Sequence, residues 1–207
     1  MKDRWLAFWK ASGATGDPER PWRFLSDAYS EPQRKYHTLR HIGHCLEEFE
    51  PARGLAKDPV AVEMALWYHD VVYDPRSKEN EERSAVLADE AAAVMGWDRG
   101  RRERITGLIR ASTHVAAAEE SDARLFTDID LSILGQPWAI FDEYERQIRE
   151  EYAWVSDPAF RSGRGALLRS FLARASIYGT PAFREKYETA ARRNLSASIA
   201  RLTGSAP

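Results

Sequence analysis

Three of the five histidines in this chain of 207 residues lie close together, as His37, His41 and His44. Their spacings of four and three residues place their side chains on one face of a helix. Neutral imidazole is a good ligand for divalent ions of borderline hardness. The cluster therefore indicates a metal site that takes a histidine from this segment, and the spacing leaves open which of the three is the ligand.

A second pair of candidate ligands, His69 and Asp70, follows directly after the apolar segment 60–68. This segment has the composition of a buried central helix. An imidazole and a carboxylate seldom end such a helix without a functional cause, and both groups bind divalent ions. We therefore expect His69 and Asp70 to be ligands of the same ion.

Two further acids, Asp128 and Asp130, interrupt the otherwise apolar segment 125–134. Burying a carboxylate costs several kcal/mol unless the group is paired or binds a metal. Either the acids are exposed, or a positively charged group meets them, and the apolar character of the segment favours the second option for at least one of them. Either acid could then be a metal ligand.

The elements that position these residues are predicted to be helices, because Ala, Leu, Glu and Arg dominate and alternating β-branched runs are missing. The expected fold is all-α, a single helical bundle. The helices are expected at 5–10, from Pro21 onward, and at about 39–49, 60–68, 81–95, 99–112, 138–152, 165–177 and 181–202.

Bulk composition argues against several classes of function. The net charge of −2 gives no field for a nucleic-acid or membrane surface, and no apolar run approaches the length of a membrane span. The first residues do not have the pattern of a signal peptide. A single cysteine, Cys45, excludes an intrachain disulfide. These features predict a cytoplasmic protein, in which Cys45 is a small buried apolar residue rather than a nucleophile.

The order of His41, the pair His69-Asp70 and Asp130, with His69 placed 28 positions after His41, resembles the HD phosphohydrolase superfamily. More closely, several segments look like a bacterial subfamily of predicted metal-dependent HD phosphohydrolases, and together they extend over nearly the whole chain. These segments are 34–42, 68–74, 80–85, 177–180 and 191–195.

This resemblance implies one HD-type helical domain over residues 1–207, with a metal-binding core at about 34–135 and helices at 138–202 that complete the bundle. It implies metal ligation by His41, His69, Asp70 and Asp130, with Asp128 as the alternative to Asp130 and His37 or His44 as alternatives to His41. The cofactor would be one or two divalent ions, among Mn, Mg, Co, Ni, Fe and Zn.

The expected activity is hydrolysis of a phosphate ester, with a small nucleotide-like molecule as substrate. Asp70 would help to position the attacking water, and Glu81 would orient it. The candidates for contact with the substrate phosphate are His37, Lys78, His114, Arg164 and Arg192, together with Arg34 and Arg40. Each has an ordinary alternative: an acid at a helix start, a histidine at a helix end, or a surface cation.

Other functions remain open at this point. The chain could be a catalytically silent regulatory domain that binds metal or nucleotide. Less favoured are a di-iron oxidase and an all-α adaptor without a site. The oligomeric state is open, with a homodimer among the options.

Overall fold

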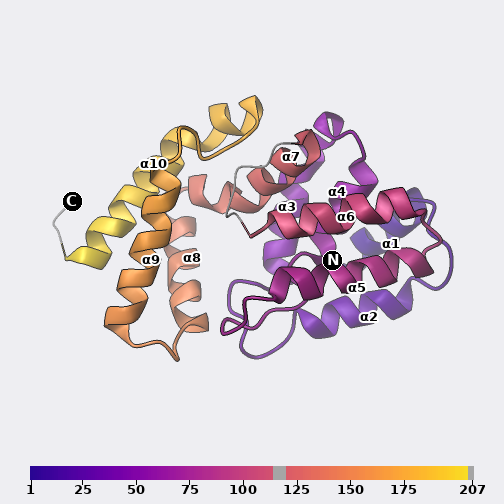
Figure 1. Cartoon of the computed structure of the whole chain (residues 1–207), viewed down its shortest axis with the longest axis horizontal. Helices are drawn as coiled ribbons and strands as arrows, with labels where there is room; N and C mark the ends of the chain where they lie inside the picture. The colour runs from indigo at the N-terminus through magenta and orange to yellow at the C-terminus, as the bar shows by residue number, and fades with distance from the viewer. Residues whose placement is uncertain (114–119, 205–207) are drawn as a thin grey trace. The chain divides into compact units, whose positions relative to one another are not determined.

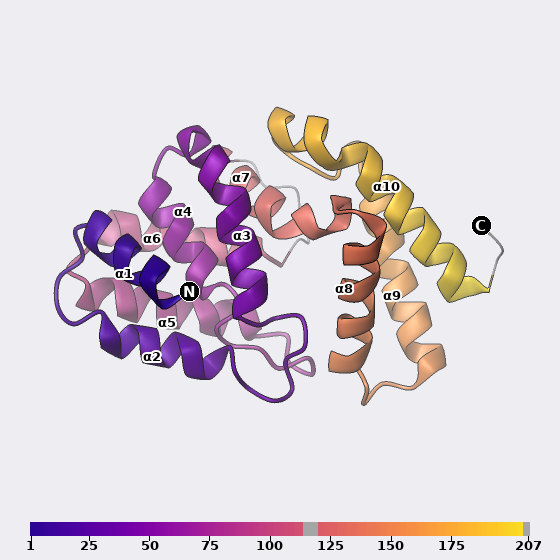
Figure 2. The ribbon, with the colours of Figure 1, turned by 180° about the vertical axis from the view of Figure 1, so that it is seen from behind.

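Helices make up the regular structure of the chain, as Figures 1 and 2 show from opposite sides. The structure is a computed structural model that describes residues 1–113 and 120–204, and within these ranges it contains α-helices and short 3-10 helices but no strand. The predicted all-α class is confirmed. The chain divides into two compact units, Met1–Phe126 and Thr127–Pro207. That residues 1–207 form one domain stays a prediction.

The first unit is built around a buried helix, α4. Its helices are α1 (Lys2–Ala11), α2 (Glu19–Ala28), α3 (Leu39–Ala52), η1 (Arg53–Leu55), α4 (Pro59–Tyr68), α5 (Asn80–Val94), α6 (Arg99–Ala111) and most of α7 (Ser121–Asp130). Every residue of α4 from Ala61 to Tyr68 is buried, and the helix packs against α3, α5 and α6. The prediction of a buried central helix is therefore confirmed.

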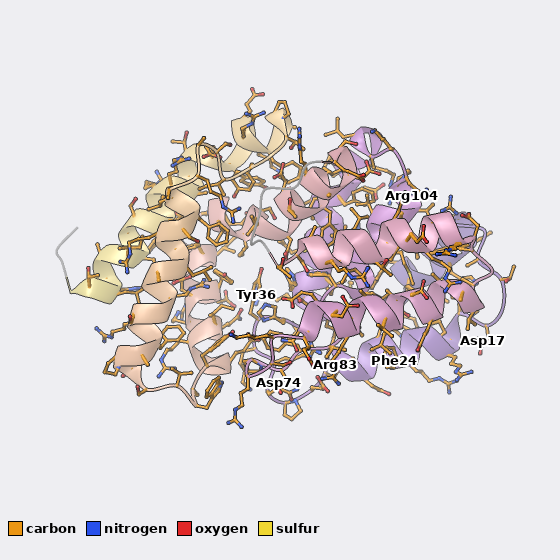
Figure 3. The ribbon with its side chains drawn as sticks, in the orientation of Figure 1. Asp17, Phe24, Tyr36, Asp74, Arg83 and Arg104 are labelled. Carbon is orange, nitrogen blue, oxygen red and sulfur yellow. The ribbon has the colours of Figure 1, made fainter. Side chains whose placement is uncertain are left out.

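Polar contacts fix where α4 begins. The Asp58 carboxylate caps the helix by accepting a hydrogen bond of 3.0 Å from the amide of Ala61. The same carboxylate pairs with Arg101 and with Arg104, which Figure 3 labels on α6. Asp122 of α7 accepts hydrogen bonds from the amides of Lys57 and Asp58. The start of α4 is thus anchored to both α6 and α7.

The second unit contains η2 (Leu131–Gly135), α8 (Trp138–Glu151), α9 (Asp157–Leu172) and α10 (Pro181–Thr203). The long helix α10 packs against α9 and η2. A Cβ atom added to Gly135 would lie 2.6 Å from Cβ of Tyr187 on α10, so this close approach requires glycine.

One predicted helix is placed wrongly. The sequence predicted a helix over 165–177, whereas α9 begins at Asp157 and ends at Leu172. Pro158 in the first turn starts the helix, and Gly163 and Gly165 lie inside it. Glycine weakens a helix, but packing of Leu168 and Phe171 in the core outweighs that cost.

Within the described part of the chain, no helix combines the length and the apolar character needed to cross a bilayer.

Candidate metal centre

Three polar atoms of the first unit converge on one point. His41 lies in the first turn of α3, His69 caps the carboxyl end of α4, and Asp70 follows it. Nε2 of His41 lies 3.1 Å from Nε2 of His69 and 3.5 Å from Oδ2 of Asp70. Nε2 of His69 lies 3.2 Å from the same Oδ2. The sequence predicted these three residues as one ligand set, and the structure brings them together.

The size of this triangle suits a divalent ion. The point equidistant from the three atoms lies about 1.9 Å from each of them in their plane. An ion displaced slightly from that plane would have bonds of about 2.0–2.2 Å, the usual lengths from zinc to imidazole nitrogen and carboxylate oxygen. These side chains could therefore hold a metal ion as one face of its coordination shell.

A second contact sets the orientation of the His69 ring. Its Nδ1 lies 3.0 Å from the carbonyl oxygen of Leu66, so we assign the proton to Nδ1 as the donor of this hydrogen bond. Nε2 then presents a lone pair to the triangle. The Phe126 ring packs edge-on against the imidazole, at 5.7 Å between centroids. Contacts of this kind fix the tautomer and direction of a metal-binding histidine.

The carboxylate is held in its charged form. Burial raises the pKa of Asp70. When the imidazoles are protonated rather than neutral, the positive charge and hydrogen bond of His69, with the charges of His37 and His41, outweigh burial and hold this pKa well below its usual range. His41 and His69 are buried, whereas the Asp70 side chain is 19% exposed. The site therefore reaches solvent on the side of Asp70.

Among the three clustered histidines, His41 supplies the nitrogen next to His69 and Asp70. The His37 ring lies just outside the triangle, stacked on Tyr73 at 4.1 Å and edge-on to His41 at 5.9 Å. His44, nearly one turn after His41, is half-buried. This geometry favours His41 as the ligand and leaves His37 at the rim.

The segment after Asp70 is hydrogen-bonded to two residues of α5 to which the sequence assigned no role at the site. The buried Ser84 hydroxyl accepts a hydrogen bond of 3.1 Å from the amide of Val72. The Asn80 side chain accepts from the amide of Asp74 and donates to its carbonyl oxygen. Figure 3 labels Asp74 in this loop. Asn80 and Ser84 both lie in a segment that carried the family resemblance, which could have indicated them.

Glu81 and Lys78 lie close to this segment in sequence. Glu81 is half-buried in the first turn of α5, and Lys78 is exposed in the loop before it. Their roles in orienting water and binding phosphate stay predictions. His114 falls outside the described residues.

The two acids of segment 125–134 differ in their surroundings. Asp128 is buried, and its carboxylate accepts three hydrogen bonds of 2.6–2.7 Å, from the amides of Gly179 and Thr180 and from the Thr180 hydroxyl. Burial raises its pKa, while these donors lower it by a smaller amount. Partners from the start of α10 thus account for the burial of Asp128 without a metal. Asp130, the last residue of α7, is half-buried.

Two arginines expected to bind substrate have structural partners in the second unit instead. The Arg164 side chain is only 8% exposed and pairs with Glu145 at 2.5 Å and with the Tyr144 hydroxyl. Arg192 pairs with Glu188 and donates to the carbonyl oxygens of residues 172, 174 and 175. These contacts account for both arginines without a substrate, and their role in binding phosphate stays a prediction.

Comparisons with family models, with curated proteins and with solved structures found no match to this chain. The case for a function therefore rests on the residues and their geometry.

Proposed function

We propose that the chain is a metal-dependent phosphohydrolase that acts on a small phosphorylated molecule, with nucleotides as the first class to test. The observation that carries the proposal is the convergence of two imidazole nitrogens and a carboxylate oxygen at 3.1–3.5 Å from one another. Hydrolysis is the part of the proposal that rests on the resemblance to HD phosphohydrolases.

Asp130 completes the proposed ligand set. The resemblance to HD phosphohydrolases implies it as the fourth ligand, beside His41, His69 and Asp70. Asp130 lies one helical turn after Phe126 on the continuous helix α7, and Phe126 contacts His69. Residues four apart on a helix lie on the same face, which supports Asp130 rather than Asp128 as the ligand.

A bound divalent ion would lower the pKa of a water molecule toward neutrality and polarise a phosphoryl oxygen. The chain's own residues would orient the reactants. The hydrogen bond from His69 to the Leu66 carbonyl keeps its Nε2 directed at the site, and the charged Asp70 carboxylate, partly open to solvent, can accept a hydrogen bond from water. Glu81 is the proposed residue that orients the water, and His37 and Lys78 are the proposed contacts to the phosphate.

Elemental analysis of the purified protein tests the metal site, followed by a panel of phosphomonoesters, nucleotides and cyclic dinucleotides with Mn, Mg, Co and Ni. We expect one or two divalent ions per chain, and we expect Asp70→Asn and His69→Ala to lose both metal and turnover. Asp74→Asn is the matched control for Asp70→Asn, because Asp74 is exposed and its carboxylate accepts a hydrogen bond from the backbone amide of Arg76. Full hydrolysis by the metal-free double variant would overturn the proposal, and tight metal binding without turnover would favour the regulatory alternative.

A further inference from the structure

A buried arginine, Arg34, contacts the backbone of the candidate metal centre. Its side chain is 0% exposed, and it precedes α3 by a short loop. Sequence reasoning considered it as a phosphate ligand, but a fully buried guanidinium cannot meet a substrate from solvent. Its cost of burial must therefore be balanced by contacts inside the protein.

Most of these contacts are hydrogen bonds that the guanidinium donates to backbone carbonyl groups. Nη1 donates to the carbonyl oxygens of Asp70 at 2.6 Å and His37 at 3.1 Å, and Nη2 donates to that of Val71 at 2.9 Å. Nε donates to the Glu31 carboxylate at 3.0 Å. The partners of Nη1 and Nη2 are all residues at, or next to, the candidate site.

The aromatic rings around the guanidinium hold its plane. Its central carbon lies 5.2 Å from the centroid of the Tyr29 ring and 5.4 Å from that of Tyr73. The Tyr29 hydroxyl donates to the carbonyl oxygen of Trp67 in the last turn of α4. Tyr73 in turn stacks on His37. Arg34 is thus enclosed by groups attached to the end of α4 and to the loop before α3.

These two segments are the ones that supply the ligands. His69 and Asp70 lie at the end of α4, and His41 lies in the first turn of α3. Nη1 and Nη2 contact the carbonyls of two consecutive residues, Asp70 and Val71, which fixes the backbone from which the Asp70 side chain departs. The contact with His37 fixes the chain that leads into α3. A lysine could not reproduce this, because its ammonium group is a single point without a planar fork.

We propose that Arg34 is the positioning residue of the His41–His69–Asp70 site, which sets the direction of Asp70 relative to the two histidines through backbone carbonyls. This inference rests on the proposed metal site but adds a residue that touches neither metal nor substrate. Residues that orient metal ligands typically contribute about 10–100-fold to metal affinity.

The test is a titration of metal-free protein with Co²⁺, followed by visible absorption, which responds to the arrangement of the ligands. We expect Arg34→Lys to bind Co²⁺ at least about tenfold more weakly than the wild type and to show a changed absorption spectrum. Arg34→Gln is the second variant. It buries no charge, so it should fold even if the lysine variant does not, and the same result is expected.

Arg164→Lys is the matched control, because Arg164 is also a buried, paired arginine but bonds to Glu145 and Tyr144 in the second unit. It should lose thermal stability without a change in the spectrum or affinity of Co²⁺. If a folded Arg34 variant binds Co²⁺ as the wild type does, the positioning role is overturned and the metal site stands. If the wild type binds no Co²⁺, Mn²⁺ or Zn²⁺, the metal site and the positioning role fall together.

Discussion

Substitution of Asp128 by Asn tests whether Asp128 has a structural role, while Asp130, two residues away, is the proposed metal ligand. The amide has the shape of the carboxylate, but only one of its two terminal atoms can accept a hydrogen bond. In the wild type, the amide of Gly179 donates to Oδ1 of Asp128, and the amide and hydroxyl of Thr180 donate to Oδ2. The NH₂ group of the asparagine must take the place of one of these two oxygens. At least one buried donor at the start of α10 then loses its acceptor.

The expected cost follows from these contacts. Loss of one hydrogen bond to a charged group, with its donor left unsatisfied, costs about 1.5–3 kcal/mol. Asn also removes a buried charge, whose burial already raises the pKa of Asp128, and this offsets part of the loss. We therefore expect about 2 kcal/mol of destabilisation. For a chain of this length, that corresponds to a decrease of about 4–8 °C in Tm.

Circular dichroism of the metal-free protein measures the Tm, and a Co²⁺ titration measures metal binding. Asp128→Asn should lower the Tm and still bind Co²⁺ with the wild-type stoichiometry. The matched variant Asp130→Asn should weaken Co²⁺ binding by at least about tenfold, as expected for loss of a ligand carboxylate. The reasoning would be refuted if Asp128→Asn abolished Co²⁺ binding while its Tm stayed at the wild-type value.

Three further predictions concern other parts of the chain. Burial raises the pKa of Asp58, but hydrogen bonds from the amide of Ala61 and from two arginines outweigh burial and hold this pKa below its usual range. Its contribution is therefore present at neutral pH and lost as the pH falls through the lowered pKa. Asp58→Asn should cost about 1 kcal/mol in urea unfolding at pH 7, and the cost should decrease as the solution is made more acidic than the usual pKa of an aspartate, about 3.9. Glu145→Gln leaves the buried Arg164 without its charge partner and should lower the free energy of unfolding by about 3–5 kcal/mol, with unchanged kcat. A large fall in kcat would indicate that Arg164 acts in the active site. Mn²⁺ at about a hundred times its Kd should raise the free energy of unfolding by about 2.7 kcal/mol and so raise the Tm. An equal rise in the Tm of Asp70→Asn at the same Mn²⁺ concentration would contradict ligation by Asp70.

The parts of the site that the sequence could predict are those carried by local pattern. The apolar segment before His69 identified a buried helix, and a ligand pair at its end had to lie at the margin of the core. The helix predicted at about 39–49 corresponds to α3. The resemblance preferred His41 among the three histidines, and the structure places His41 next to His69 and Asp70. Both inferences depend on residues close together in the chain, where helical geometry is known in advance.

The parts that could not be predicted depend on distant partners. The sequence indicated that a buried acid in segment 125–134 needs a partner, but the partners of Asp128 lie 51 and 52 residues further on, in Gly179 and Thr180. Burial of Arg34 and Arg164 could not be predicted either, because the chain has 30 basic residues and residue type alone does not show which of them are buried. The extent of α9 was missed because its glycines are tolerated through tertiary packing.

The way in which buried charges find their partners gives the strongest physical reason to look for a metal. Arg164 faces a carboxylate, Arg34 faces carbonyl groups and one carboxylate, and Asp128 faces amides and a hydroxyl, so each charge meets groups that complement it. At His41, His69 and Asp70 the pattern is different, because three atoms that can all act as acceptors point at one another. Protons on the imidazoles can satisfy some of these contacts, but one divalent ion satisfies all of them, which is why metal analysis is the experiment with the most consequence for this chain.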